Sequence, residues 1–188
     1  MSEGDWSGEK LLLQHRGVTL AAGLTAEELR RVEEIHRFHF PPDLRSFLSC
    51  VLPIGLRFPN WRTPESSELL NQLAWPFEGI AFDIENNVFW WKPWGARPEA
   101  LSEAIAVAKA AVDRAPRLIP IYGHRYLPAN PEIAGNPVFS VYQTDIIYYG
   151  VDLRQYFACE FGRIDHAEAV RGEPRHIPFW TDLVEDNA

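Results

Sequence analysis

The sequence predicts a single α+β domain in which helices and strands are segregated along the chain. Helical patterns are grouped early while β-prone runs come mostly late, and too few helices separate the strands for the crossovers of a parallel α/β sheet. The 188 residues fit one ordinary domain. Because 46% of them are hydrophobic, the chain can bury a core that offsets the entropy lost on folding.

The first predicted helix runs from Ala26 to His36. Thr25 can cap it, and Glu28 can reach back to the backbone of Thr25, which is a capping box. We expect one side of this helix to form a buried apolar stripe and the other to form a charged, solvent-exposed face. The buried stripe contains Leu29, Val32 and either Ile35 or His36. The solvent-exposed face contains Glu27, Glu28, Arg30, Arg31, Glu33 and Glu34.

A second helix is expected after Pro41 and Pro42, because apolar residues keep the i, i+3, i+4, i+7 spacing from Leu44 to Val51. A loop with aromatic anchors follows at residues 58–61. After this loop we expect a short helix from Pro64 to about Leu73.

A β-hairpin is predicted over residues 80–91. Its two runs are apolar and β-prone, and they flank the turn-forming pair Asn86-Asn87. Successive strand residues point to opposite faces, so either Trp90 or Trp91 is exposed if one face of the hairpin is solvated. Exposed Trp residues are enriched in the binding hot spots of interfaces.

The longest helical pattern covers residues 98–114 and precedes three β-prone segments. These segments are residues 118–122, 138–143 and 145–149, and we expect the last two to pair antiparallel. A final helix through Phe161 is expected after Asp152, which can cap it, and Gly162 can close it.

The composition opposes several classes of partner. The formal net charge of -8 disfavours phosphate backbones and anionic lipid, so we expect no nucleic-acid partner and no membrane partner. No apolar run approaches the roughly 20 residues of a membrane-spanning helix, and residues 1–10 lack the cationic start of a signal peptide. Cys50 and Cys159 fall in apolar helical patterns, where we expect buried, unpaired thiols. These features predict a cytoplasmic protein.

No motif for catalysis or cofactor binding is present in the sequence. The chain contains neither the GxxxxGK[ST] string nor the GxGxxG string of nucleotide-binding loops. His36 and His39 have a spacing that can serve a metal on a helix, but Pro41 breaks that helix and no nearby carboxylate or Cys completes the set. We therefore expect no cofactor, no metal and no enzymatic activity.

His124, Arg125 and Asp145 form the most site-like polar cluster. If the strands pair as expected, Asp145 approaches His124, and such a pair can act as a general acid and base. The alternative is structural: His124 and Arg125 form hydrogen bonds with loop carbonyls and with Asp145, and so fix the irregular connection over residues 128–137. We favour the structural role, because no nucleophile with a recognisable flank accompanies the pair.

Acids without neighbouring bases mark a candidate partner-binding surface. Between Thr63 and Trp91 the chain has five acids and no Lys or Arg. A second run without bases, from Tyr126 to Leu153, carries Glu132, Asp145 and Asp152. If these two stretches share a face, that face is acidic with aromatic anchors and suits a basic protein partner. Otherwise the acids are scattered in solvent, and the Trp residues pack in the core or at its rim. The candidate partner-binding residues are Glu65, Glu68, Glu78, Asp83, Glu85, Trp90, Trp91 and Trp94.

Six pieces of the chain, taken in order, carry a family resemblance. They are Leu24 to Leu29, Phe40 to Leu48, Phe58 to Trp61, Phe82 to Asn87 with Trp94-Gly95, Leu118 to Tyr126, and Pro137 to Tyr142. Together they resemble the SUKH superfamily, in particular its branch related to the fungal Smi/Knr cell-wall regulators, over residues 24–162. The resemblance implies N-terminal helices packed on a mostly antiparallel β-sheet. Outside it we expect a partly helical N-terminal extension over residues 1–23 and a C-terminal tail over residues 163–188, anchored by the cluster Ile177, Pro178, Phe179 and Trp180.

The resemblance also implies protein binding. Many bacterial relatives look like immunity proteins that neutralise toxins, often nucleases, by direct binding, and other relatives act as scaffolds or regulators. We expect an immunity protein that binds a basic toxin domain, itself a monomer or weak dimer. The alternatives are a non-catalytic scaffold or regulator of the Smi/Knr type and, if His124 and Asp145 pair, a small hydrolase.

Overall fold

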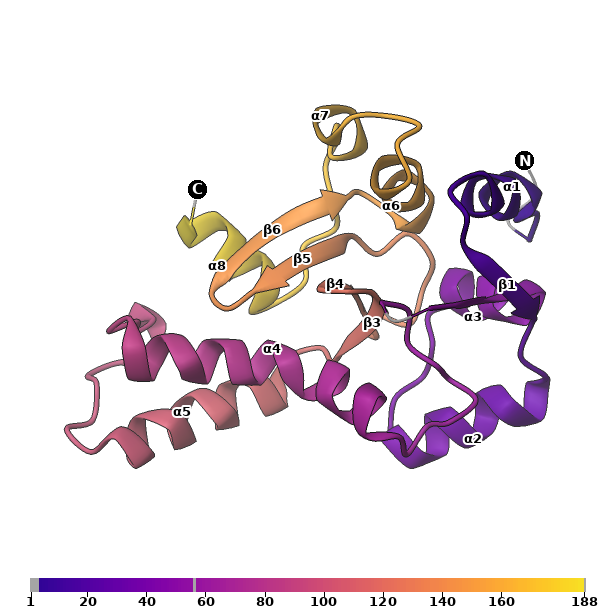
Figure 1. Cartoon of the computed structure of the whole chain (residues 1–188). Coiled ribbons are helices and arrows are strands. Elements are labelled where there is room, and N and C mark those ends of the chain that lie inside the picture. The colour runs from indigo at the N-terminus through magenta and orange to yellow at the C-terminus, as the bar shows by residue number, and fades with distance from the viewer. Residues whose placement is uncertain (1–3, 56, 188) are drawn as a thin grey trace.

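The computed structural model describes residues 4–55 and 57–187 and confirms a single α+β domain (Figure 1). Its helices are α1 (Ser7–His15), α2 (Ala26–His36), α3 (Pro42–Cys50), α4 (Ser67–Asn86), α5 (Leu101–Arg114), α6 (Leu153–Glu160), α7 (His166–Ala169) and α8 (Trp180–Asn187), with a 3-10 turn η1 (Lys92–Trp94). Its strands are β1 (Thr19–Ala22), β2 (Val51–Ile54), β3 (Leu118–Tyr122), β4 (Arg125–Pro128), β5 (Val138–Tyr142) and β6 (Asp145–Gly150). Strands β1 and β2 pair antiparallel, and β3 to β6 form an antiparallel meander in chain order.

The four-stranded sheet is buried on both faces. Neighbouring residues on one strand point to opposite faces and enter different clusters: Ile119 and Leu127 enter one, while Leu118 and Tyr126 enter the other. The first cluster joins the sheet to α1, α2, α3 and α6, and the second joins it to α4, α5 and α8. The expected packing of N-terminal helices on an antiparallel sheet is confirmed, and a second helical layer covers the other face.

Helix α2 has the predicted bounds. The hydroxyl of Thr25 accepts a hydrogen bond from the backbone N–H of Glu28 at 3.1 Å, and the carboxylate of Glu28 accepts one from the backbone of Thr25 at 2.7 Å. The predicted capping box is therefore confirmed. Of the two alternatives for the buried stripe, His36 is buried and Ile35 is exposed.

The predicted placement of Glu33 on the solvent-exposed face of α2 is wrong, because Glu33 is buried. Its carboxylate accepts hydrogen bonds from the guanidinium of Arg45 at 2.6 Å and from the backbone N–H of Phe40 at 3.0 Å. These charge-assisted bonds satisfy a carboxylate that would otherwise be costly to bury. Glu33 therefore ties α2 to the start of α3.

The predicted hairpin over residues 80–91 is wrong. Residues 80–86 belong to α4, a 20-residue helix that continues beyond the expected stop at Leu73. Its buried residues lie on one helical face and are Leu69, Pro76, Ile80, Asp83 and Ile84. The apolar run that favours a strand in isolation is therefore the face of a helix that packs against the sheet. After Asn86 the helix ends, and Val88 takes a positive φ of 58°.

Two further features differ from the expectations. Strands β1, β2 and β4 have no counterpart among the predicted elements. Each has only four residues, too few for a clear local pattern, and each is recognised by its pairing: β1 with β2, and β4 with β3 and β5. Cys50 is exposed and Cys159 is partly exposed, which corrects the prediction of buried thiols. Cys50 is the last residue of α3, where the chain leaves the helix for β2.

Residues near both ends of the described chain pack into the body of the domain. Trp6 is buried in the first cluster, and its indole N–H donates to the hydroxyl of Ser46 at 3.0 Å. Ile177, Phe179 and Trp180 are buried in the second cluster, against the sheet and α4. Strand β1, which falls in the expected N-terminal extension, pairs with β2 in a separate two-stranded sheet.

Candidate protein-binding face

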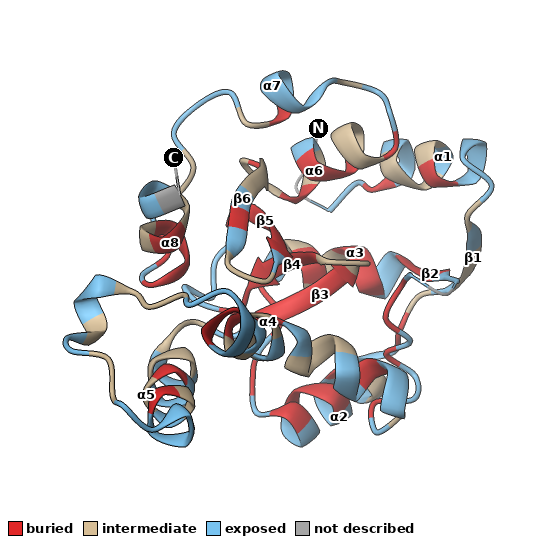
Figure 2. Cartoon of the chain, turned by 60° about the vertical axis from the view of Figure 1, so that its left-hand side comes forward, coloured by how far each residue is buried: buried red, intermediate tan, exposed pale blue. Residues whose placement is uncertain are grey.

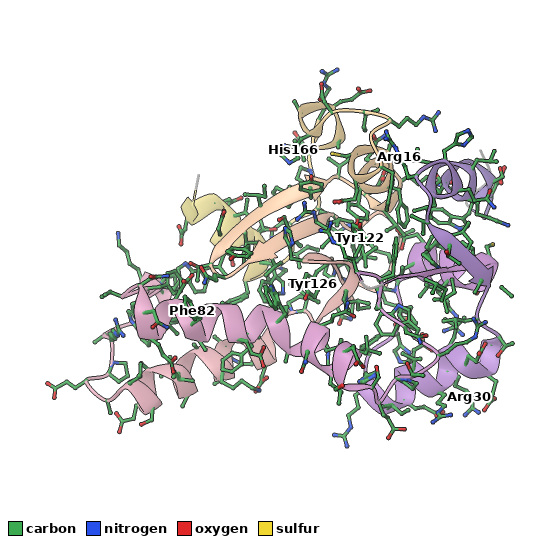
Figure 3. All side chains as sticks on the ribbon, in the orientation of Figure 1. Arg16, Arg30, Phe82, Tyr122, Tyr126 and His166 are labelled. Carbon is green, nitrogen blue, oxygen red and sulfur yellow. The ribbon has the colours of Figure 1, made fainter. Side chains whose placement is uncertain are left out.

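Helix α4 carries an exposed stripe on the side away from its buried face. Asn71, Trp75, Glu78, Phe82 and Glu85 recur every three or four residues, so they form one line along the helix. Trp75 is 42% exposed and Phe82 is 46% exposed, although both are large apolar side chains. Figure 2 shows both buried and exposed residues along α4, and Figure 3 shows Phe82 on this helix.

The turn between β5 and β6 rests on α4 beside this stripe. Gly79 comes so close to the turn that a Cβ at this position would lie 2.8 Å from the Cα of Gln143. The indole N–H of Trp75 donates to the backbone carbonyl of Val141 at 3.1 Å. Tyr142 is 54% exposed, and its ring centre is 6.4 Å from that of Trp75. Tyr142 therefore extends the aromatic surface beyond the helix.

We define the α4 face as the exposed residues Glu68, Trp75, Glu78, Phe82, Glu85 and Tyr142. Its three acids are among those predicted from the sequence. Within residues 4–55 and 57–187, none of the three forms an ion pair. The face thus combines uncompensated negative charge with exposed aromatic rings.

Two of the predicted acids lie elsewhere. Glu65 precedes α4, and its carboxylate is 3.5 Å from the guanidinium of Arg31 on α2. Asp83 is only 4% exposed, which corrects its placement on a partner-binding surface. Its carboxylate accepts hydrogen bonds from Thr144 in the β5–β6 turn and from the side chain of Asn87. Asp83 therefore holds the turn on α4.

The three predicted Trp residues pack with one another at the end of α4. Trp94 makes edge contacts with Trp90 and Trp91, with ring centres 5.1 and 5.8 Å apart. Trp91 also contacts Phe179 at 5.4 Å, and its indole N–H donates to Asp186 on α8. All three Trp residues are partly buried, and none lies in a strand. Their packing fixes the loop after α4 to the C-terminal segment.

The polar cluster predicted around Arg125 has a different acidic partner. Arg125 is buried, and its guanidinium donates to Glu160 on α6 at 3.1 Å and to the hydroxyl of Ser140 at 2.8 Å. The same group lies 3.7 Å from the ring centre of Tyr149. Asp145 is exposed at the start of β6, and among the described residues it forms no ion pair with Arg125, which corrects its predicted place in this cluster. The Arg125–Glu160 pair instead joins β4 to α6.

His124 does not form the acid-base pair considered above. It lies in the turn before β4, and β5 separates β4 from β6. Within the described parts of the chain, no hydrogen bond joins His124 to Asp145. Burial lowers the pKa of His124, and the neighbouring guanidinium groups of Arg125 and Arg57 lower it further. These effects favour the neutral imidazole.

Trp75, Phe82 and Tyr142 were not among the predicted site residues. A signal for the first two exists in the sequence: the series 71, 75, 78, 82, 85 keeps helical spacing and alternates polar with aromatic residues. The predicted hairpin divides this series between a helix that ends near Leu73 and a strand that begins at Ile80, so the series does not appear as one helix. Tyr142 has no such signal, since its place beside Trp75 depends on the packing of β5 against α4.

Comparisons with family models, with curated proteins and with solved structures find no match to this chain. Over residues 4–55 and 57–187, no helix is long and apolar enough to cross a membrane. In the same residues, no group of three or more His, Cys, Asp or Glu side chains is arranged to hold a metal ion.

Proposed function

We propose that this protein acts by binding a basic protein through the α4 face. The observation that carries the proposal is the exposed stripe on α4, where Trp75 and Phe82 alternate with Glu78 and Glu85. Large aromatic residues dominate the binding energy of many interfaces, and rim charges speed the encounter of complementary partners. The net charge of -8 adds to this attraction.

The way the face is held also favours binding. Gly79 and Asp83 fix the β5–β6 turn on α4, and the bond from Trp75 to Val141 sets the orientation of the indole ring. A partner therefore meets an indole ring whose orientation is already fixed, which lowers the entropy lost on association. The exposed rings belong to a helix and a strand, and such elements hold contact residues more rigidly than loops do.

The SUKH resemblance supports a more specific role, that of a cytoplasmic immunity protein. In this role the protein, a monomer or weak dimer, binds a basic bacterial toxin domain, such as a nuclease, and neutralises it. The protein itself needs no catalytic group for this task. Neutralisation follows when the bound protein covers the toxin's active site or blocks its substrate.

The first experiment tests the partner class. Toxin domains encoded beside this gene are expressed alone and together with the protein, and cell growth and complex formation are measured. Rescue of growth with a stable complex supports the immunity role. A complex without rescue supports binding in a scaffold or regulatory role instead, and the absence of any complex contradicts the proposal.

The second experiment tests the face. With a bound partner in hand, Phe82→Ala should weaken binding by about tenfold or more, because a large apolar side chain is removed from the contact. The double change Glu78→Lys and Glu85→Lys should slow association and reduce its salt dependence. Glu173→Lys is the matched control, because Glu173 is exposed in the segment between α7 and α8. Equal effects of the control and the α4 variants would place the interface elsewhere.

A further inference from the structure

A hollow of about 300 Å³ lies next to the α4 face, between α4 and the turn that joins β3 to β4. The residues that line it are Arg57, Asn71, Gln72, Trp75, Gly123, His124 and Tyr126. Its volume is at the lower end of the range for small-molecule sites. Tyr122 and Tyr126, which border this region, lie near the centre of the molecule in Figure 3.

Arg57 supplies a cation to this hollow. Its guanidinium carbon lies 4.4 Å from the ring centre of Tyr122, and its backbone carbonyl accepts a hydrogen bond from Gly123 at 2.7 Å. A Cβ at Gly123, whose φ is 57°, would lie 2.9 Å from a terminal nitrogen of Arg57, so the glycine leaves room for the guanidinium. Across the described residues no carboxylate lies within ion-pair distance of Arg57. Its guanidinium therefore lies over the Tyr122 ring without an acidic partner among the described residues.

The rest of the wall offers apolar surface and amide groups. The indole N–H of Trp75 is already bonded to Val141, so the ring presents carbon to the hollow. The hydroxyl of Tyr126 donates to the backbone carbonyl of Gln72 at 2.8 Å and is likewise satisfied. The side-chain amides of Asn71 and Gln72 make no hydrogen bond to any described residue. A ligand with one polar end and an apolar body matches this wall.

The charges around the hollow select the kind of polar end. Burial and the two guanidinium groups lower the pKa of His124, which favours its neutral form, so Arg57 is the permanent cation of the wall. Burial raises the pKa of Tyr126, and the negative charge of Glu78 raises it further, so the same charge also opposes the entry of a second negative charge. A planar monoanion fits better than a phosphate dianion, and the guanidinium fork matches a carboxylate.

We propose that this hollow binds an organic monocarboxylate, with the carboxylate on Arg57 and the apolar body against Trp75. The carboxylate can belong to a free acid or to the C-terminus of another protein, since both present the same group. The site does not depend on the proposed binding of a basic protein by the α4 face, and it can be tested without any partner.

The test uses ligands that differ only in charge. 3-Phenylpropionate and its amide are titrated into the purified protein, and so are a tripeptide ending in phenylalanine and its C-terminal amide. Binding is measured by calorimetry and by the shift of the Trp75 indole N–H resonance in NMR spectra. We expect at least one acid to bind at millimolar concentration, with its amide weaker by about tenfold. Preference for the free acid or for the peptide identifies the source of the carboxylate.

Two variants complete the test. Arg57→Gln should weaken binding of the acid by about tenfold and should leave the fold intact, because Arg57 is exposed and has no ion pair among the described residues. Arg114→Gln is the control, since Arg114 is an exposed cation at the end of α5. Equal binding of acid and amide, equal loss in both variants, or no binding of either acid would overturn the proposal.

Discussion

The carboxylate of Asp83 accepts two hydrogen bonds from Thr144, one from the backbone N–H at 2.9 Å and one from the hydroxyl at 2.6 Å. Asp83 lies on α4 and Thr144 lies in the β5–β6 turn, so this pair joins two elements 61 residues apart in the chain. The contact is largely buried, because Asp83 is 4% exposed. An acid that resembles its exposed neighbours in sequence therefore has a structural role.

Replacing Asp83 by Ala should lower the free energy of unfolding by about 2–3 kcal/mol, because hydrogen bonds to a buried charge are lost and the Thr144 donors are left without their acceptor. Urea unfolding followed by circular dichroism measures this change. Glu85→Ala is the matched control, since Glu85 is exposed two residues further along the same helix, and its effect should stay within about 0.5 kcal/mol. Similar values for the two variants would contradict the assigned role of Asp83.

Gly79 should not tolerate a side chain, although alanine is the better helix former. A Cβ at this position would lie 2.8 Å from the Cα and 3.0 Å from the backbone nitrogen of Gln143, neither of which is a flexible side-chain end. Gly79→Ala should therefore destabilise the protein by about 1–3 kcal/mol. Gly8→Ala is the control, because a Cβ at Gly8 on α1 meets nothing within 4 Å and should leave the stability unchanged or raise it by up to about 1 kcal/mol. Thermal unfolding of both variants measures these changes in stability. A Gly79→Ala protein with unchanged stability would show that the turn can move away from α4.

The stability of the protein should decrease when His36 takes up a proton. Burial lowers the pKa of His36 from its ordinary value of 6.5, and its Nε2–H donates to the carbonyl of Pro64 at 2.8 Å. Arg117 lowers this pKa further, while Glu65 and the bond to Pro64 partly oppose the shift. Since the unfolded chain binds the proton more readily, the contribution of His36 is greatest above about pH 6.5 and is lost as the pH falls through the pKa of the folded protein.

Urea unfolding of the wild type and of His36→Gln at about pH 7.5 and about pH 5.5 measures this contribution. The amide of glutamine can donate to Pro64 but does not titrate in this range. The loss of stability between the two pH values should be smaller in the variant than in the wild type. An identical loss in both proteins would assign the pH dependence to other groups.

Elements with strong local signals could be predicted from the sequence. The capping box at Thr25 and Glu28 and the spacing of apolar residues determine α2, and the proline pair before Leu44 determines the start of α3. The β-prone runs likewise predict β3, β5 and β6, and the cap at Asp152 predicts the start of α6. Local steric and hydrogen-bonding preferences act within a few residues, so the sequence alone contains them.

The fold class, the order of these elements and the acidic character of the 63–91 segment were thus determined by the sequence itself. The tertiary structure decided which of those acids are exposed, because burial of Asp83 depends on Thr144 and the ion pair of Glu65 depends on Arg31. It also decided that residues 80–86 continue α4, since packing on the sheet and α5 overrides the local preference for a strand. Contacts between residues far apart in the chain stabilise these arrangements. The helical spacing of residues 71–85 is present in the sequence, but it does not by itself exclude the strand.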